Sequence, residues 1–201
     1  MIKVYGDASL GNCYKIKLLF SFLQIEHKWQ FIDIVAKDNR TDEFRALNPD
    51  TKIPVVQFED GRALCESNAI LHYFAESTSF WPKDTYEQSL ALQWLFFEQY
   101  SLEPYIARAR YINKHLGLPK VRKLEFQSKQ RQGHRGLKVM DKQLGENKFF
   151  VGDTPTIADV SLFANSHLAK EGGFDLSKYR NIRKWIGRIE VIPHFIKIET
   201  D

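Results

Sequence analysis

The hydrophobic positions of the first quarter of the chain follow two different periods. Ile2 to Gly6 and the looser alternation of His27 to Ile34 are typical of strands. Between them, Cys13 to Leu23 carries apolar residues with the spacing of one helical face, at Ile16, Leu19, Phe20 and Leu23. The pattern predicts a strand, a helix and a second strand, with the first helix entered from a polar loop.

The same alternation of elements continues to about Glu76. Lys37 to Leu47 predicts a short helix, and Val55 to Phe58 predicts a strand. An Asp-Gly turn leads into a second short strand, Ala63 to Cys65, and a helical pattern then begins. The order is βαβαββα, with the first two strands parallel and the last two an antiparallel hairpin. This is a thioredoxin-like arrangement.

Strand signals are absent from the rest of the chain. A long helical pattern runs from Asp84 to about His115, with a break or bend near Pro104. Further helices are predicted from Leu118-Pro119 to about Leu144 and from Tyr179 to Glu190. The predicted fold class is an α/β thioredoxin-like domain, residues 1–77, joined by a linker, residues 78–84, to an all-α domain, residues 85–201.

Two local features of the helical part predict how it packs. Gly133 and Gly136 lie inside a predicted helix, where glycine costs about 1 kcal/mol relative to alanine. Close packing of a neighbouring helix explains them. Thr156 and Asp159 have the spacing of a capping box, so we expect a buried helix to start there and assign both residues to folding.

Composition narrows the class of protein. Hydrophobic residues make up 43% and charged residues 27%, as in ordinary globular chains. No apolar run reaches the length of a membrane span, and the first residues form a strand pattern rather than a signal peptide. Cys13 and Cys65 do not make a disulfide framework, so we expect a reducing, cytoplasmic setting.

Charge is uneven along the chain. Residues 108–142 contain eleven Lys and Arg but only Glu125 and Asp141 as acids. One interpretation is a basic face that attracts an anionic ligand or nucleic acid; the other is a solvated helix face. The sequence contains no recognised nucleic-acid motif, and we expect no nucleic-acid partner.

Candidate ligand-binding residues lie around Pro54 in the sequence. Proline has no N–H for a strand ladder, and an Ile-Pro bond at this turn is a candidate for the cis form. The main-chain groups of Ile53 are then available to an extended ligand. Glu66 and Ser67 stand at the start of a predicted helix, where backbone donors and the helix dipole favour a carboxylate.

These segments resemble the glutathione S-transferase superfamily, as does the run from Phe150 to Asp159. The resemblance rests on Asn-Pro-x-x-Lys-Ile-Pro, on Glu-Ser and on Phe-Val-Gly-Asp-x-Pro-Thr-Ile-Ala-Asp. It implies a cis Pro54, pairing of Ile53 with the cysteinyl backbone of glutathione, and binding of the γ-glutamyl end by Glu66 and Ser67. Lys52 takes the place that often contacts the glycyl carboxylate, with an ordinary solvated lysine as the alternative.

The family takes its thiol donor from the loop after the first strand. The run Ser-Leu-Gly-Asn-Cys-Tyr-Lys resembles a bacterial subgroup, which implies Asn12, then Ser9, as the catalytic donor. Ser9 departs from that pattern because the subgroup's serine aligns with Leu10. Alternatively, Ser9 or Asn12 is the N-cap of the first helix. Cys13 is either a reactive first-turn thiol or a small buried side chain.

The resemblance implies a glutathione transferase, active in detoxification, that directs the glutathione thiolate at an electrophilic or disulfide substrate. It also implies a homodimer and a second-substrate pocket between the two domains, for which Tyr105 and Arg108 are candidates. The histidines do not cluster, so we expect no metal. A glutathione-dependent disulfide reductase and a non-catalytic binding module remain the alternatives.

Overall fold

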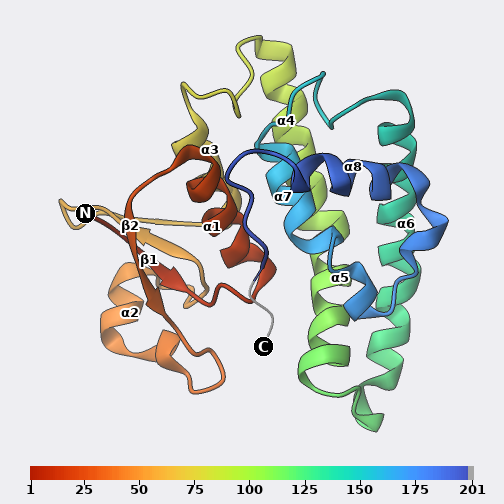
Figure 1. Ribbon diagram of the computed structural model, residues 1–201. Coiled ribbons are helices and arrows are strands. Elements are labelled where there is room, and N and C mark those ends of the chain that lie inside the picture. The colour runs from red at the N-terminus through yellow and green to blue at the C-terminus, as the bar shows by residue number, and fades with distance from the viewer. Residues whose placement is uncertain (199–201) are drawn as a thin grey trace. The chain divides into compact units, whose positions relative to one another are not determined.

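Residues 1–198 are described by a computed structural model, shown in Figure 1. The chain divides into two compact units, Met1–Glu76 with the segment from Pro193 onward, and Ser77–Ile192. The elements of the first unit are β1 (Ile2–Gly6), α1 (Gly11–Leu23), β2 (His27–Phe31), η1 (Asp38–Arg40), α2 (Asp42–Leu47), β3 (Val55–Gln57), β4 (Ala63–Cys65) and α3 (Ser67–Ala75).

The sheet of the first unit has the order β2-β1-β3-β4. β1 and β2 are parallel, whereas β3 is antiparallel to both β1 and β4. The predicted βαβαββα order and the antiparallel hairpin are confirmed.

Side chains alternate between the two faces of this sheet. Val4 and Val56 are register partners and are fully buried. On the opposite face, Val55 packs with Phe44 of α2 and with the partly buried Tyr5. α1 and α3 lie together on the other side of the sheet from α2 (Figure 1).

Two predicted elements of the first unit are shorter than expected. β2 ends at Phe31 rather than Ile34, because Asp33 Oδ1 accepts hydrogen bonds from the N–H groups of Val35 and Ala36 and closes a turn. The predicted helix Lys37–Leu47 divides into η1 and α2, and Thr41 caps the second part by accepting from Phe44 N–H.

The segment that follows the last helix packs on α1. Tyr14 Oη donates to the Ile196 carbonyl at 2.6 Å, and Ser21 Oγ donates to the His194 carbonyl at 2.7 Å. Ile198 is buried. The end of the described chain is therefore part of the first unit.

The second unit is helical throughout. Its elements are α4 (Thr85–Phe97), η2 (Glu98–Leu102), α5 (Glu103–Arg110), η3 (Tyr111–His115), η4 (Lys120–Arg122), α6 (Lys123–Glu146), α7 (Ile157–Ser166), η5 (Ala169–Gly172), η6 (Leu176–Lys178) and α8 (Arg180–Glu190). The predicted break near Pro104 is the π-helical turn η2, which separates α4 from α5 directly before that proline.

One helix start differs from the prediction. α6 begins at Lys123, not at Leu118-Pro119. Leu118 has φ +52° and is not helical, because a proline disfavours helical geometry in the residue before it. Pro119 itself is extended. The 3₁₀ turn η4 then leads into α6.

Gly133 and Gly136 of α6 each lie against a neighbour, which is the predicted kind of element, a helix, only for Gly136. A Cβ at Gly133 would overlap the ring of Phe174, and one at Gly136 would lie 2.8 Å from the Ser101 carbonyl oxygen. The predicted capping box is also present, with Thr156 and Asp159 reciprocally bonded at the start of α7. Asp159 is fully buried.

Candidate functional site

The strand register brings three loop segments to one edge of the sheet. Tyr5 lies opposite Val55, which in turn lies opposite Cys65. Because β3 is antiparallel to both neighbours, the end of β1, the start of β3 and the end of β4 meet at the same edge. The loop after β1, the Ile53-Pro54 turn and the start of α3 therefore converge, and they carry the predicted residues of the first unit.

The start of α1 corrects one interpretation of the loop after β1. Leu10 is the N-cap, and its side chain makes no cap hydrogen bond. The alternative that Ser9 or Asn12 is the N-cap is therefore wrong. Ser9 precedes the cap, and its N–H donates to Asp7 Oδ1 at 2.9 Å. Asn12 is the second helical residue, where backbone N–H groups have no intrahelical acceptor.

Asn12 is the least satisfied polar side chain of this region. Its Oδ1 atom is buried and has no hydrogen-bond partner within residues 1–198. A buried amide group without a partner costs about 1–3 kcal/mol, so such groups call for an explanation. A ligand bound at the α1 N-terminus would explain the unpaired Asn12 oxygen. The Asn12 carboxamide can offer such a ligand an acceptor or, if the amide group is rotated by 180°, a donor.

Cys13 is an inert side chain in this fold. It is completely buried, with Sγ so close to Gly6 that a Cβ there would lie 2.8 Å from the sulfur. Burial raises the pKa of the Cys13 thiol to about 12. Because the thiolate is the reactive form, the alternative of a reactive first-turn cysteine loses its support. Cys65 is half-buried, its pKa also raised by burial.

The turn before β3 has the predicted geometry. The Ile53-Pro54 peptide bond is cis. Buried Asn48 holds the turn, since its Nδ2 donates to the Lys52 carbonyl at 2.8 Å and its Oδ1 accepts from Asp50 N–H at 3.1 Å. Neither backbone group of Ile53 is hydrogen-bonded to another described residue. An extended ligand can pair with them.

The start of α3 is also as predicted. Glu66 is exposed and occupies the N-cap position, with an unusual backbone at φ +66° and ψ +110°, and its side chain makes no cap bond. Ser67 is the first helical residue and is buried. Strained backbone of this kind is concentrated at functional sites, where the surrounding structure enforces it. The N–H groups of the first turn point toward the same edge as the Ile53 backbone.

Sequence reasoning missed one residue of this site. Lys15 is fully buried, and its Nζ donates to Ser67 Oγ and to Asn68 Oδ1, both at 3.3 Å. A signal was available, because Lys15 lies three and seven residues before Leu18 and Phe22, on the apolar stripe of the helix. Lysine in such a stripe needs a polar partner.

Lys52 has an ordinary surface environment. Its Nζ pairs with Asp50 Oδ2 at 2.7 Å, and both side chains are mostly exposed. An exposed pair of this kind contributes at most about 1 kcal/mol. The lysine is accessible to a ligand, and its predicted contact stays a prediction.

Tyr105 and Arg108 lie on α5 and contact side chains of α6. Arg108 Nε donates to Glu125 Oε1 at 2.8 Å, and Lys129 Nζ lies 5.5 Å from the centre of the Tyr105 ring. Their role in a second-substrate pocket stays a prediction. The nearby aromatic run divides, since Trp94 belongs to the core whereas Phe96 and Tyr100 are exposed.

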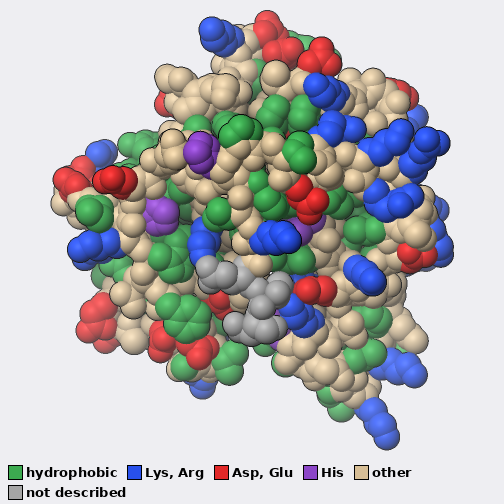
Figure 2. Space-filling view, viewed as in Figure 1, with side chains coloured by type: hydrophobic (Ala, Val, Ile, Leu, Met, Phe, Trp, Pro, Cys, Tyr) green, Lys and Arg blue, Asp and Glu red, His purple; other side chains and the backbone are tan. Residues whose placement is uncertain are grey.

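The basic stretch 108–142 separates into paired and solvated residues. Four of its cations pair with two acids, Arg108 and Arg122 with Glu125, and Arg110 and Lys114 with Glu171. The exposed ones are Lys120, Lys123, Arg131, Arg135, Lys138 and Lys142. On the face in Figure 2, Lys and Arg gather over the part of the second unit formed by α6 and α8.

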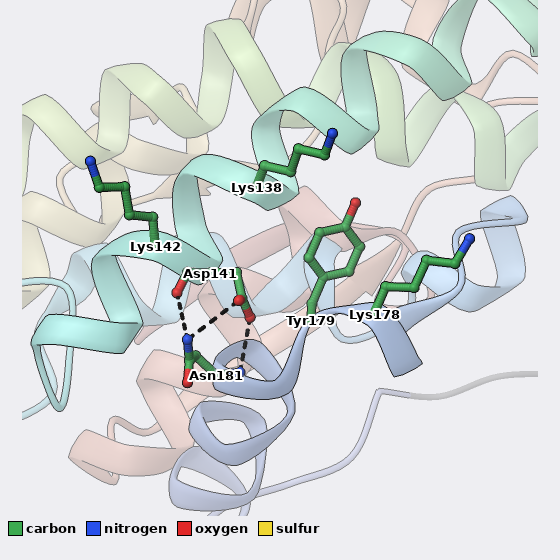
Figure 3. A pocket seen from close by; sticks show the side chains of 6 residues that line it. All are labelled: Lys138, Asp141, Lys142, Lys178, Tyr179 and Asn181. Atoms are coloured by element: carbon green, nitrogen blue, oxygen red, sulfur yellow. Dashed lines mark hydrogen bonds between the residues drawn. The ribbon is translucent and has the colours of Figure 1, made fainter.

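A surface hollow of about 310 Å³ lies in this basic region. It is lined by Lys138, Asp141, Lys142, Lys178, Tyr179 and Asn181. In Figure 3 the Lys142 side chain extends away from those of Lys138 and Lys178. The Asp141 carboxylate binds the start of α8 instead of facing the three lysines. Its Oδ1 accepts hydrogen bonds from the N–H groups of Asn181 and Ile182 at 2.9 and 3.0 Å. The arrangement is that of a solvated helix face with a capping carboxylate.

No helix within residues 1–198 is both long and apolar enough to cross a membrane. Across the same residues, no three His, Cys, Asp or Glu side chains are grouped so as to hold a metal ion.

Comparison with known proteins decides the family. Residues 12–77 match the model of the glutathione S-transferase N-terminal domain, and residues 94–193 match that of the C-terminal domain. The chain belongs to the glutathione S-transferase family. The N-terminal match begins at Asn12, so it includes that residue, the Ile53-Pro54 turn and the start of α3 but not Ser9.

Individual relatives of the family span nearly the whole chain. A crystal structure of a glutathione S-transferase from Pseudomonas fluorescens Pf-5 is 46% identical, covers 99% of each chain and has a TM-score of 0.98. Glutathione S-transferase 2 of Anopheles gambiae is 29% identical, over 92% of this chain and 88% of the relative. Disulfide-bond oxidoreductase YfcG of Escherichia coli K12 is 28% identical, over 96% and 92%. The fold class and the superfamily resemblance are thereby confirmed.

Proposed function

We propose that this protein is a glutathione transferase that activates the glutathione thiolate for attack on a small electrophile. The observation that carries the proposal is the convergence, at one sheet edge, of the unpaired Ile53 backbone with the N-termini of α1 and α3. Glutathione is a peptide with a thiol between two carboxylate ends. The site offers backbone pairing at its centre and donors for a thiolate and a carboxylate on either side.

Asn12 is the proposed thiol donor, with Ser9 in support. A free thiol has a pKa near 8.5, so an enzyme must favour the thiolate at neutral pH. A carboxamide N–H at the positive end of α1 does this by hydrogen-bonding the anion. The thiolate then attacks an electrophilic carbon. A carbon–sulfur bond forms, the leaving group departs with its electron pair, and the thiol proton has already passed to solvent.

Glutathione-dependent disulfide reduction is the second candidate. Its support is the similarity to a disulfide-bond oxidoreductase over 96% of the chain. In that reaction the thiolate attacks one sulfur of a disulfide and the other leaves as a thiolate. A second glutathione then resolves the mixed disulfide, giving oxidised glutathione and a second thiol. Since Cys13 is buried, both thiols in this scheme belong to glutathione.

Calorimetric titration with glutathione from pH 5 to pH 9, on wild type and Asn12→Ala, tests the proposal. We expect wild type to bind and to lower the thiol pKa, and the variant to bind without that shift. Unchanged pKa values in both proteins would favour a non-catalytic binding module, and absence of binding would overturn the glutathione site. Turnover of an aryl halide against a dialkyl disulfide separates transferase from reductase.

A homodimer in a reducing, cytoplasmic setting completes the proposal, with detoxification of electrophiles as the role. Leu92, Phe96 and Tyr100 follow one another at four-residue spacing across α4 and η2 and are all exposed, which is the pattern of an unpartnered apolar face. Both cysteines are free thiols. Sedimentation of wild type and Phe96→Glu tests the dimer. A monomeric wild type would overturn it.

A further inference from the structure

A fully buried lysine joins two helices of the first unit. Lys15 lies in the second turn of α1, and its side chain has no exposed surface. Lysine is almost never buried completely unless its ammonium group is paired, because removing that charge from water is costly. The hydrogen-bond partners of Lys15 therefore indicate its role.

Two of those partners belong to the first turn of α3. Lys15 Nζ donates to Ser67 Oγ and to Asn68 Oδ1 at 3.3 Å each. An ammonium group has three donors and no acceptor, so both oxygens must act as acceptors toward it. The single hydroxyl proton of Ser67 is thereby directed away from Lys15. The carboxamide oxygen of Asn68 is likewise held toward Lys15.

The two hydrogen bonds from Lys15 favour donors over acceptors at the α3 N-terminus. The backbone N–H groups of its first turn are donors, and the helix dipole makes that end positive. Lys15 adds a cation behind them and turns Ser67 into a donor. A group bound by Ser67 and these N–H groups has to be an acceptor and gains from negative charge, which describes a carboxylate rather than an amine or an amide N–H.

We propose that Lys15 is a positioning residue for carboxylate recognition at the start of α3. In the proposed function the ligand group is the α-carboxylate of the γ-glutamyl end of glutathione, so the inference rests on that function. Lys15 does not touch the ligand. It acts through Ser67 and Asn68, which it holds in the orientation that a carboxylate requires.

The test compares two ligands and two lysines. The ligands are glutathione and its analogue without the α-carboxylate, γ-aminobutyryl-cysteinyl-glycine. The variants are Lys15→Met, which removes the charge and the donors at similar volume, and the matched control Lys17→Met, two residues further along the same helix. Replacing a buried charge by an apolar side chain of similar volume is often neutral for stability, and urea unfolding of each variant checks this here.

We expect wild type to prefer glutathione over the analogue by about tenfold or more, the usual worth of charge-assisted hydrogen bonds. Lys15→Met is expected to lose that preference, with weaker glutathione binding and an analogue affinity within about twofold of wild type. Lys17→Met is expected to keep it. Because only the carboxylate-bearing ligand responds, the result separates positioning from general damage to the fold.

Other outcomes overturn the inference in distinguishable ways. Equal losses for both ligands in Lys15→Met would assign Lys15 a purely structural role. A retained preference would show that Ser67 needs no orientation by Lys15. If Lys15→Met does not fold, Lys15→Arg decides, because it keeps the charge and donors and is expected to keep the preference. Wild type that binds neither ligand would overturn the proposed function itself.

Discussion

The indole N–H of Trp185 donates to Asp159 Oδ1 at 2.9 Å, which ties the last helix of the second unit to the capping box of α7. The same carboxylate accepts from the N–H groups of Phe150 and Thr156. Three segments of chain, those of Phe150, of the α7 capping box and of Trp185, therefore meet at one buried carboxylate. This carboxylate organises the second unit much as the Lys15–Ser67 contact organises the first.

Asp159 gives the stability of the protein an unusual pH dependence. Burial raises its pKa to about 6, against the lowering effect of the hydrogen bonds from Thr156, Trp185 and Phe150. The folded state therefore binds a proton that the unfolded state releases between about pH 4 and pH 6. The stability that this proton contributes is fully present below pH 4 and is lost as the pH rises through 6.

Urea unfolding of wild type and Asp159→Asn at pH 4, 5, 6 and 7 measures this effect. We expect the variant to be less stable by about 1–3 kcal/mol, because an amide NH₂ cannot accept from Thr156 N–H. The difference between the two proteins is expected to shrink as the pH rises from 4 to 6. A difference that does not depend on pH would contradict the raised pKa.

Gly133 is required by the packing of α6. Gly133→Ala places a methyl group in the space of the buried Phe174 ring, so we expect a loss of about 1–3 kcal/mol in the free energy of unfolding. Gly187→Ala in α8 is the control, since nothing lies within 4 Å of its Cβ position. That change is expected to stabilise by up to about 1 kcal/mol. Equal effects of the two substitutions would refute the packing argument.

Asp141 caps a helix to which it does not belong. Asp141→Ala leaves the N–H groups of Asn181 and Ile182 without their acceptor and is expected to cost about 1–2 kcal/mol. Asp141→Asn keeps an acceptor and loses only the charge, so its cost is expected to be smaller. Chemical denaturation measures both, with Ala in place of the exposed Asp153 as the reference. Equal costs for the Ala and Asn variants would mean that the charge, not the hydrogen bond, is what α8 needs.

Cys13 is expected to resist thiol reagents in the folded protein. Its burial and its pKa of about 12 leave almost no thiolate at neutral pH. In a Cys65→Ala background, a chromogenic disulfide is expected to label no thiol until denaturant is added, and then one. Rapid labelling of the native variant would show that the start of α1 opens to solvent.

Local patterns in the sequence were enough to predict most of the helices and strands, and the Ile53-Pro54 and Glu66-Ser67 segments of the site. The capping box and the Asp-Gly turn each span four residues, and the Ile53-Pro54 motif is contiguous, so each is set by neighbours in the chain. The start of α6 differs from the prediction because the sequence pattern places Pro119 at the beginning of a helix. In the structure it follows a residue at positive φ and is extended.

Contacts between residues far apart in the chain follow only from the way the helices and strands pack. Lys15 and Ser67 are separated by 52 positions, and Asp141 and Asn181 by 40. No periodicity or spacing in the sequence predicts such pairs, because they depend on which helices pack together. Local sequence patterns were sufficient for the two-part fold, the family resemblance and the Ile53-Pro54 and Glu66-Ser67 segments. The strand register then brought those segments to one edge, and helix packing placed a buried cation behind one of them.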